Sequence, residues 1–402
     1  MSPVLVIGAS LAGLTAADSL RSGGYGGELV VVDPSPELPP DRPPLSKQVL
    51  AGEWEPGRAV IRVAERLPEL GVDLRLGVSA TALDAATREV QLSDGSAVSA
   101  AGVVLAVGAT PRHLPDAPDR GVHVLRTMKD CLSLRADLDA GPTRVAVIGA
   151  GFIGAEVAAT CRERGLEVTM IEAGPVPLGR VLPGDIGTFI ADVHRQHGVE
   201  VRLGVGVDGL EADADGRVCA VRMADGSTVD ADVVVVGIGV VPNIGWLEGS
   251  GLTLDDGIRC DESLLAAPGI VAAGDATSWR NPRFDEVMRV EQWENAIEQG
   301  EHAARRLLAE LGLGDHPGEF APIPWFWSDQ YDRKLQMAGR PAGGDTAVIV
   351  EGSIEERRFV ALFRRGDRCT AVLGVNRPRH VMQARMKMAE TLEWGTVQGL
   401  FA

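Results

Sequence analysis

The stretch VIGASLAG (Val6–Gly13) follows a short apolar run at the start of this 402-residue chain. A related stretch, VIGAGFIG (Val147–Gly154), begins 141 positions later. The second has all three glycines of the G-x-G-x-x-G turn that binds dinucleotides, whereas the first has Ser10 in place of the middle glycine. Two such turns, one domain length apart, predict two copies of a nucleotide-binding domain.

The composition favours a protein of two or three domains with large cores, because 45% of the residues are hydrophobic. A net charge of −17 argues against nucleic-acid binding, although a local basic patch for another partner is compatible with it. No apolar run has the length of a membrane span, and no signal sequence precedes the first strand. We therefore expect a cytoplasmic protein that does not bind membranes.

The five cysteines are scattered along the chain, without a C-x-x-C or C-x4-C pair. This pattern predicts reduced structural thiols, with no metal site and no redox-active disulfide. No cysteine precedes Cys131, so the first glycine turn has no nearby thiol.

Short β-branched runs bounded by Gly, Pro or Asp predict strands, and helices are expected at Gly13–Ser22 and Phe152–Arg164. Alternating strands and helices predict an α/β fold with parallel, doubly wound sheets. The expected strands are Val4–Ile7, Leu29–Asp33, Val103–Val107, Val145–Ile148, Val168–Glu172, Val233–Val236 and Ile270–Ala273.

The same order of elements occurs twice. In each copy the second strand ends in an acid, Asp33 or Glu172, and a later strand runs into a proline, in LAVGATP (Leu105–Pro111) or VVGIGVVP (Val235–Pro242). We interpret the chain as a glutathione-reductase-like pair of Rossmann-like domains, with the second inserted into the first. The first would span residues 1–112 and 244–320, and the second residues 113–243.

The residue pattern changes after about residue 320, where an aromatic-rich segment begins. Thr346–Glu351, Arg358–Arg364 and Thr370–Val375 predict a three-stranded antiparallel meander, and a helix is expected near Arg379–Leu392. Residues 321–402 therefore form a predicted α+β domain.

In a strand–turn–helix context, the backbone of a glycine turn holds a pyrophosphate at the helix N-terminus, and the acid accepts a ribose hydroxyl. Such a turn can also simply pack a helix on a strand. Glu172 would repel a 2′-phosphate, which favours NADH in the second copy. The strand-Gly-Asp segment AAGDA (Ala272–Ala276) points to FAD in the first copy. Ser10 is either tolerated there or donates its hydroxyl to a phosphate.

Several further stretches resemble a known family, the FAD- and NADH-dependent ferredoxin reductases of bacterial oxygenase systems (the putidaredoxin reductase and biphenyl dioxygenase ferredoxin reductase group). The resemblance runs nearly end to end, and Ser10 and Val107 depart from it. It is carried by AAGDA and by RPPLSK (Arg42–Lys47), GAGFIGAEVAA (Gly149–Ala159), VVGIGVVPN (Val235–Asn243), RVEQWENAIEQG (Arg289–Gly300) and PWFWSDQYDRKLQMAG (Pro324–Gly339).

The resemblance implies roles for individual residues. It places Arg42 near the FAD diphosphate and Lys47 near the isoalloxazine, where a cation stabilises negative charge. It pairs Glu156 with Lys47 and the nicotinamide carboxamide, so that Lys47 and Glu156 are the candidate catalytic residues. The alternatives are a solvated lysine, and an acid that responds to its helix dipole. Trp327 would lie beside the isoalloxazine, or else fill a core.

The complete set of candidate cofactor residues follows from the motifs and the resemblance together. For FAD it is Gly8, Ser10, Leu11, Ala12, Gly13, Asp33, Arg42, Lys47, Ala106, Gly108, Gly274, Asp275, Glu291, Gln292, Trp293 and Trp327. For NADH it is Gly149, Gly151, Phe152, Ile153, Gly154, Glu156, Glu172, Arg180, Gly237, Ile238 and Gly239.

The implied reaction takes electrons from NADH through FAD, one at a time, to a [2Fe–2S] ferredoxin that feeds a cytochrome P450 or an aromatic-ring oxygenase. Because such ferredoxins are usually acidic, we expect a basic docking patch. An apoptosis-inducing-factor-like protein, which senses NADH and mainly binds, is the alternative. The docking candidates are Arg305 and Arg306, and a cluster of Arg364, Arg365, Arg377, Arg379 and Lys387.

Overall fold

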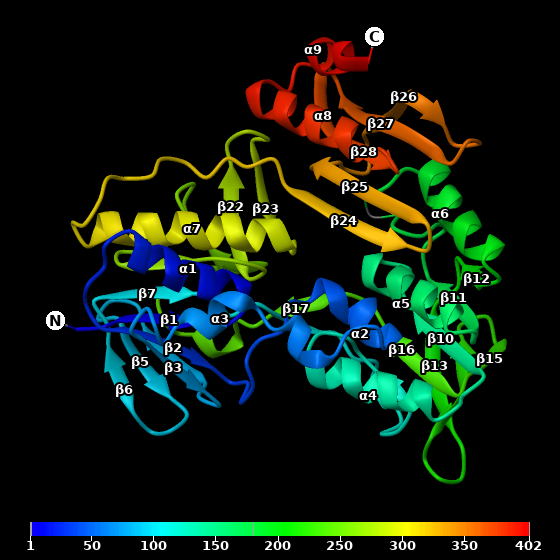
Figure 1. Cartoon of the computed structure of the whole chain (residues 1–402), viewed down its shortest axis with the longest axis horizontal. Coiled ribbons are helices and arrows are strands. Elements are labelled where there is room, and N and C mark those ends of the chain that lie inside the picture. The colour runs from blue at the N-terminus through cyan, green and yellow to red at the C-terminus, as the bar shows by residue number, and fades with distance from the viewer. Residues whose placement is uncertain (1, 180, 402) are drawn as a thin grey trace. The chain divides into compact units, whose positions relative to one another are not determined.

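The computed structural model describes residues 2–179 and 181–401, which form two compact units (Figure 1). Each unit is assembled from three separate segments of the chain. The first unit comprises Met1–Asp41, Val60–Thr110 and Val241–Pro324. The second unit comprises Arg42–Ala59, Pro111–Val240 and Trp325–Ala402.

A six-stranded sheet in the order β20-β21-β7-β1-β2-β3 forms the centre of the first unit. All neighbours are parallel except β20, which is antiparallel to β21. The β-branched strands are buried, as expected of a parallel sheet covered on both faces. Their bounds are β1 (Val4–Ile7), β2 (Leu29–Asp33), β3 (Val72–Leu76), β7 (Gly102–Leu105), β20 (Leu265–Ala267) and β21 (Ile270–Ala272).

Helix α1 (Leu11–Ser22) packs against α7 (Trp293–Glu310), and Figure 1 shows the two side by side. Their close approach requires Gly300, because a Cβ there would lie 2.6 Å from the carbonyl oxygen of Ala12. The unit also contains α3 (Arg62–Arg66), a three-stranded sheet of β4 (Ala80–Asp84), β5 (Glu89–Leu92) and β6 (Ala97–Ser99), and a four-stranded sheet of β18 (Leu254–Asp255), β19 (Gly257–Arg259), β22 (Thr277–Asn281) and β23 (Glu286–Arg289).

The second unit repeats the parallel arrangement in a five-stranded sheet of order β12-β11-β10-β16-β9. Helices α2 (Gln48–Ala51), α4 (Met128–Asp139) and α5 (Phe152–Glu163) contribute to the core on this sheet. The strands are β9 (Val122–His123), β10 (Arg144–Ile148), β11 (Glu167–Glu172), β12 (Glu200–Leu203) and β16 (Val233–Val236), and a second sheet consists of β13 (Val207–Ala212), β14 (Val218–Met223) and β15 (Thr228–Asp230).

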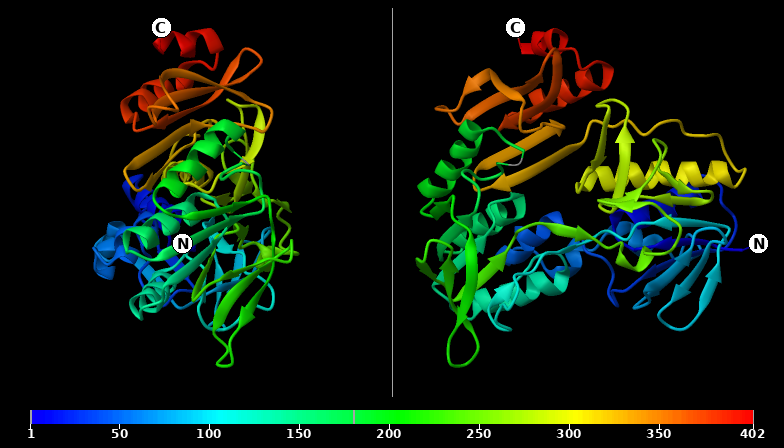
Figure 2. Two further views of the ribbon diagram at one scale, coloured as in Figure 1. Left: turned by 90° about the vertical axis from the view of Figure 1, so that its right-hand side faces the viewer. Right: turned by 180° about the vertical axis from the view of Figure 1, so that it is seen from behind.

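The C-terminal part of the second unit is an antiparallel sheet of order β24-β25-β28-β27-β26 between two helices (Figure 2). Helix α6 (Gly184–Gln196) packs on one face, where its apolar side chains share a core with alternating strand residues such as Leu373 and Val375. Helix α8 (Pro378–Glu390) packs on the other face, where Val381 meets Gly374. The strands are β24 (Trp325–Gln330), β25 (Arg333–Gly339), β26 (Thr346–Ser353), β27 (Arg358–Arg365) and β28 (Arg368–Val375), and α9 (Trp394–Gln398) follows α8.

The predicted three-stranded meander is thus part of a sheet of five strands. The aromatic-rich segment supplies the two additional strands, β24 and β25, whose tight connection contains Tyr331 at φ 54°. All seven strands predicted in the parallel sheets are present, with ends that differ by at most two residues. Helix α1 begins at Leu11, two residues before its predicted start.

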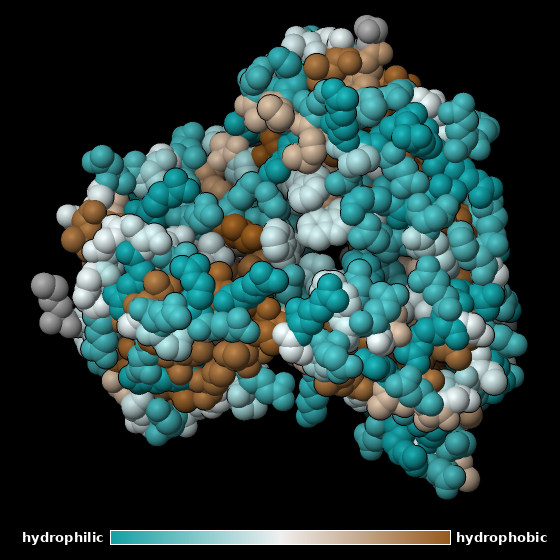
Figure 3. Space-filling model, in the orientation of Figure 1, coloured by the Kyte–Doolittle hydropathy of each residue, from teal (hydrophilic) through white to brown (hydrophobic). Residues whose placement is uncertain are grey.

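The short remaining elements are the 3-10 turns η1 (Pro43–Ser46), η2 (Pro56–Ala59), η3 (Gly245–Leu247) and η4 (Gly399–Phe401), and a two-stranded sheet of β8 (Ala109–Pro111) and β17 (Val240–Pro242). In the view of Figure 3, hydrophilic residues cover most of the surface, and hydrophobic residues are interspersed over α8 and α9. Across residues 2–179 and 181–401, no helix is both long and apolar enough to cross a membrane.

Candidate functional site

The first glycine turn connects β1 to α1 with a backbone that only glycine can adopt comfortably. Gly8 has φ +108°, and a Cβ at this position would lie 2.2 Å from the carbonyl oxygen of Ala106. The next N–H group, that of Ala9, donates to Asp33 Oδ2 at 2.7 Å. The acid at the end of β2 therefore braces the turn through one oxygen, and its remaining lone pairs can serve a ligand.

The second turn, between β10 and α5, has the same construction. Gly149 has φ +97°, and a Cβ there would lie 2.4 Å from the carbonyl oxygen of Gly237. Glu172 Oε2 accepts from the N–H of Ala150 at 2.9 Å, and its Oε1 accepts from Gly174. The duplication seen in the sequence is therefore a duplication of geometry.

The last glycine of each turn lets its helix approach the preceding strand. A Cβ on Gly13 would lie 1.8 Å from the carbonyl oxygen of Gly8, and a Cβ on Gly154 would lie 2.0 Å from that of Gly149. These two glycines cannot be replaced without shifting the turn. They fix the position of the helix N-terminus relative to the sheet.

Ser10 occupies a position that accepts a side chain. It is the N-cap of α1 with φ −86° and ψ −171°, and Gly151 is the N-cap of α5 with nearly the same angles, −74° and −179°. A Cβ built on Gly151 meets no atom within 4 Å. A serine at the middle position of the turn therefore causes neither backbone strain nor a clash with other atoms of the protein.

Both helices leave their N-termini available to an anion. Neither α1 nor α5 has a side-chain cap or an acidic residue in its first turn. The N–H groups of Leu11 and Ala12, and of Phe152 and Ile153, belong to these first turns. An uncapped helix start after a glycine turn fits a pyrophosphate, because the N–H groups and the helix dipole both favour negative charge.

The other candidate residues of the two turns lie at the carboxyl ends of neighbouring strands, which is where parallel α/β sheets bind ligands. Ala106 and Gly108 follow β7, and Gly274 and Asp275 follow β21, all in the first unit. In the second unit, Gly237, Ile238 and Gly239 follow β16.

The turn after β21 also fits a polar ligand. Gly274 has φ +85°, and its N–H donates to Gln299 Oε1 at 2.7 Å. Three buried polar atoms have no partner within the described chain: Gln292 Oε1 at the N-cap of α7, and Asn295 Oδ1 and Gln299 Nε2 on the helix itself. Buried groups of this kind are normally hydrogen-bonded, so their presence beside the Gly-Asp turn suits an FAD with many polar atoms.

The predicted stretch Glu291–Trp293 forms the start of α7. Gln292 is the N-cap, and Trp293 Nε1 donates to Asp41 Oδ1 at 2.7 Å. Glu291 pairs with Arg289, which also donates to the carbonyl of Asp275.

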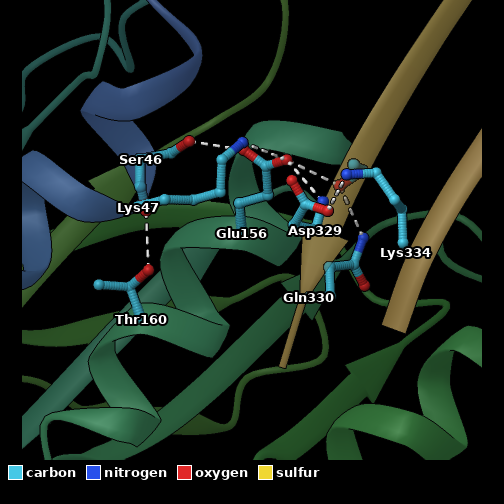
Figure 4. Close-up of polar contacts among 8 residues, drawn as sticks. Ser46, Lys47, Glu156, Thr160, Asp329, Gln330 and Lys334 are labelled. Atoms are coloured by element: carbon cyan, nitrogen blue, oxygen red, sulfur yellow. Dashed lines mark hydrogen bonds and ion pairs between the residues drawn. The ribbon is translucent and has the colours of Figure 1, made fainter. Parts of the chain in front are cut away.

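A buried cluster in the second unit centres on Glu156 (Figure 4), which is 6% exposed on the second turn of α5. Lys47 Nζ lies 3.0 Å from Glu156 Oε1. Ser46 Oγ donates to Oε2 at 2.5 Å, Ser328 Oγ donates to Oε1 at 2.9 Å, and the N–H of Asp329 donates to Oε1 at 3.3 Å. Because its partners come from other elements, this carboxylate does not act as a cap of its own helix.

The position of Lys47 is fixed by its neighbours. Ser46 ends η1, and its carbonyl accepts from Thr160 Oγ1 on α5 at 2.8 Å. The Pro-Pro turn thus attaches the segment carrying Lys47 to the helix that carries Glu156 (Figure 4). Lys47 is not a fully solvated lysine, because its side chain is only 14% exposed.

The candidate FAD residues do not all belong to one unit. Those of the first turn and of α7 lie in the first unit, whereas Arg42, Lys47 and Trp327 belong to the second. Trp327 is half-buried on β24 and packs against Trp325. The two ring centroids lie 5.3 Å apart, and the ring planes are tilted by 31°. Arg180 lies outside the described residues.

Sequence reasoning missed the partners of Glu156 other than Lys47. Ser46 directly precedes Lys47 in RPPLSK, and Ser328 directly follows Trp327 in PWFWSDQ. Their small hydroxyls gave no signal of their own. Their positions next to Lys47 and Trp327 were the one indication in the sequence that they belong to the site.

Four of the five thiols are buried, and that of Cys219 is half-buried. All five cysteines are free. Burial raises the pKa of Cys131 to about 11, and the pKa of Cys161 and of Cys369 to about 12. Thiols with such raised pKa values are poor nucleophiles near neutral pH. Among residues 2–179 and 181–401, no cluster of His, Cys, Asp and Glu is suited to a metal.

One docking candidate is wrong. Arg306 is 7% exposed, pairs with Glu310 at 2.7 Å and donates to Ser263 Oγ at 3.0 Å. The periodicity of α7 turns it inward, while its neighbour Arg305 is exposed. Arg305 belongs to the first unit, and Arg379 and Lys387 lie on α8 in the second, where Lys387 pairs with Glu390.

Comparison with known proteins agrees with this geometry. The family model described as pyridine nucleotide-disulphide oxidoreductase matches residues 2–300, and the model described as reductase C-terminal matches residues 325–397. The chain therefore belongs to the pyridine nucleotide-disulphide oxidoreductase family.

Individual relatives narrow the class. The chain is 40% identical to rhodocoxin reductase from Rhodococcus erythropolis over 96% of this chain and 89% of the relative. It is 38% identical to the ferredoxin–NAD(+) reductase component of an anthranilate 1,2-dioxygenase system from Burkholderia cepacia, over 96% and 94%. Its fold matches the covalent putidaredoxin reductase–putidaredoxin complex with a TM-score of 0.92 at 34% identity, covering 99% of this chain and 95% of that chain.

These findings confirm the predicted resemblance and the predicted fold class of two Rossmann-like folds with a C-terminal α+β part. They also confirm that the protein is an enzyme, an oxidoreductase of a family that uses FAD and NAD(H). The human relative named apoptosis-inducing factor 3 is more distant, at 32% identity, and this chain covers 60% of it.

Proposed function

We propose that this protein is an NADH-dependent ferredoxin reductase that passes electrons, one at a time, to a [2Fe–2S] ferredoxin serving an oxygenase. The observation that carries the proposal is the pair of geometrically equivalent glycine turns, one in each unit, each with an uncapped helix and a bracing acid. The name of one relative supplies the ferredoxin and a dioxygenase system.

When bound, FAD accepts a hydride from NADH and releases the two electrons singly. The chain's own residues would hold and orient the two cofactors. We assign the first turn, Asp33 and the Gly274–Asp275 turn to FAD, and the second turn with Glu172 to NADH. The corresponding domains are residues 1–112 and 244–320 for FAD, 113–243 for NADH, and 321–402 for the C-terminal domain.

Glu172 would select NADH. Its carboxylate ends β11 and is held in place by the N–H groups of Ala150 and Gly174. A fixed negative charge at the ribose position accepts the 2′-hydroxyl of NADH and repels the 2′-phosphate of NADPH.

Lys47 and Glu156 would set the charge where the hydride is transferred. By the resemblance, the ammonium group of Lys47 faces the isoalloxazine, and the carboxylate of Glu156 orients both Lys47 and the nicotinamide carboxamide. A preorganised charge of this kind stabilises charge that develops during transfer. No acid–base pair is needed, because the cofactors carry the chemistry.

No thiol step is part of the proposal, because no dithiol lies near the first turn in the sequence and the buried thiols have raised pKa values. We also propose the cytoplasm as its location. The support is the five free thiols, which are typical of a reducing compartment.

The test is steady-state reduction of a [2Fe–2S] ferredoxin by the FAD-loaded protein, with NADH and NADPH compared at equal concentrations. We expect rapid ferredoxin reduction with NADH. A tight complex with NAD and negligible turnover would instead indicate a sensor.

A further inference from the structure

A buried series of hydrogen bonds along one face of the C-terminal sheet links Glu156 on α5 to His194 on α6, and the proposed function does not use it. Gln330 Nε2 lies 3.2 Å from Ser328 Oγ, which is 2.9 Å from Glu156 Oε1. At its other end, Gln330 Oε1 lies 3.1 Å from His194 Nε2, and His194 Nδ1 lies 3.2 Å from the hydroxyl of Tyr331. All five residues belong to the second unit.

The fold explains why these side chains meet. Ser328 and Gln330 are two residues apart on β24, so they point to the same face of the sheet. That position is reached by α6, whose apolar residues pack on the sheet and carry His194 into the interior. Ser328, Gln330 and His194 are each fully buried, at 0% exposure.

Each hydrogen bond between Glu156 and Tyr331 in this series has one possible direction, which is set by the carboxylate. An ionised Glu156 only accepts, so Ser328 must donate its hydroxyl to it and accept from the amide NH2 of Gln330. The amide oxygen of Gln330 then faces His194, which must carry its proton on Nε2. The bare Nδ1 of His194 consequently accepts from the hydroxyl of Tyr331.

The charges of the neighbouring residues keep the direction of these hydrogen bonds fixed. The pKa of His194 is lowered to about 4, mainly by burial; the hydrogen bond with Gln330 opposes this decrease, and the neighbouring His197, whose ring centroid lies 3.7 Å from that of Tyr331, adds to it. His194 is therefore neutral near pH 7. On the other side, Lys47 faces Glu156, while the carboxylate of Asp329 pairs with Lys334 at 3.2 Å.

We propose that Gln330 is a positioning residue for hydride transfer: through Ser328, and backed by His194, it holds the Glu156 carboxylate in the orientation that faces Lys47. The proposal rests on the function proposed above for Glu156. Gln330 would act by orientation and polarisation. A proton relay is not involved, because an amide does not exchange its donor and acceptor ends readily.

A double-mutant cycle tests this role. In stopped-flow reduction of the bound flavin, we expect Gln330→Leu to lower the limiting rate about fivefold with little change in the apparent Kd for NADH. In a Glu156→Gln background, the same change should lower the rate by less than about 1.5-fold, because the residue acts through the carboxylate. Equal factors in both backgrounds would overturn the proposal and leave Gln330 as a packing residue.

The matched control is Thr370→Val, which removes the hydroxyl of another buried side chain of the same sheet, whose Oγ1 donates to Asp345 Oδ2 at 2.6 Å. Thr370 is 4% exposed, so the two changes disturb the sheet to a similar extent. We expect Thr370→Val to leave the limiting rate unchanged. A fall equal to that of Gln330→Leu would attribute the effect to the sheet as a whole.

A second readout does not depend on activity. In protein labelled with 15N-histidine and assigned with a His194→Asn variant, the nitrogen shifts of His194 should show the Nε2–H tautomer near pH 7. Ser328→Ala removes the link that fixes the direction, so a mixture of both tautomers is expected. A pure Nδ1–H tautomer in the unaltered protein would contradict the proposed direction of these hydrogen bonds.

These results separate the two proposals. If the flavin of Glu156→Gln were reduced as fast as that of the unaltered protein, the role proposed for Glu156 would be wrong. The tautomer of His194 would still test the hydrogen bonds from Glu156 to Tyr331. If Glu156→Gln were slow but the cycle were additive, the function would stand and the role of Gln330 would fail.

Discussion

At the residue scale, Glu172 combines two tasks that a substitution can separate. Its two oxygens hold the N–H groups of Ala150 and Gly174, and its charge is the proposed barrier to NADPH. Glutamine keeps an acceptor oxygen and removes the charge. We expect Glu172→Gln to narrow the ratio of kcat/KM for NADH over NADPH by about tenfold, equivalent to about 1.4 kcal/mol.

The control is Glu167→Gln, at the exposed start of the same strand, which should leave the ratio unchanged. Steady-state kinetics with both dinucleotides measure the effect. An unchanged preference in Glu172→Gln would remove this residue from nucleotide selection.

The two unusual positions of the first turn should differ sharply in tolerance. Gly8→Ala places a methyl group 2.2 Å from a carbonyl oxygen on a backbone with φ +108°, so we expect loss of bound FAD and a lower melting temperature. Ser10→Gly should retain FAD, because the serine lies in a relaxed N-cap conformation. Flavin absorbance per chain after purification measures both, and FAD loss from Ser10→Gly would show that the serine hydroxyl holds the cofactor.

At the scale of elements, the docking of α6 on the C-terminal sheet should depend on pH through His194. Burial lowers the pKa of this imidazole from 6.5 to about 4. Below pH 6.5 the unfolded chain binds a proton that the folded chain does not, so the free energy of unfolding decreases on acidification. Integrating between the two pKa values gives a loss of about 2 kcal/mol from pH 7.5 to pH 5 for this residue.

Denaturant unfolding at the two pH values checks this expectation. His194→Gln should show a smaller decrease than the unaltered protein, whereas substitution of the exposed His113 should not change it. His302 on α7, whose pKa burial also lowers to about 4, adds a decrease of the same sign in the first unit. An increase in stability on acidification would contradict both assignments.

The elements differ in how far the sequence predicted them. The parallel strands were predictable because they are short β-branched runs that end in glycine or an acid, as in β1 and β10. Strands β24 and β25 were not, because their segment mixes three large aromatics with Arg333 and Lys334 and lacks a regular alternation. The two strands pair with each other, and β25 joins the sheet by pairing with β28, which is distant in the sequence.

The same contrast holds for the candidate site. The turns carry their chemistry locally, so Gly8, Gly149 and the bracing acids could be found from spacing. Apart from Lys47, the residues that surround Glu156 could not be found in this way, since Ser328 and Gln330 lie more than 170 residues away from it and only the fold brings them to α5. The inward orientation of Arg306 likewise depends on which face of α7 is buried.

At the scale of the whole molecule, a chain with net charge −17 is proposed to bind an acidic partner. Binding then requires local basic groups, and the exposed candidates are Arg305, Arg364, Arg365 and Arg379. We expect the rate of ferredoxin reduction at limiting ferredoxin to fall at least about tenfold between low salt and 0.5 M salt, because screening weakens steering. A rate indifferent to salt would exclude electrostatic docking.

The most direct test of the central claim is an anaerobic double-mixing stopped-flow experiment on the FAD-loaded protein. NADH is mixed first and an oxidised [2Fe–2S] ferredoxin second, while the flavin and ferredoxin absorbances are followed separately. We expect flavin reduction by NADH to be at least about tenfold faster than by NADPH, because of the charge of Glu172, and to be followed by reduction of two ferredoxin molecules per NADH. Equal reduction by NADPH, or a reduced flavin that persists when ferredoxin is added, would contradict this expectation.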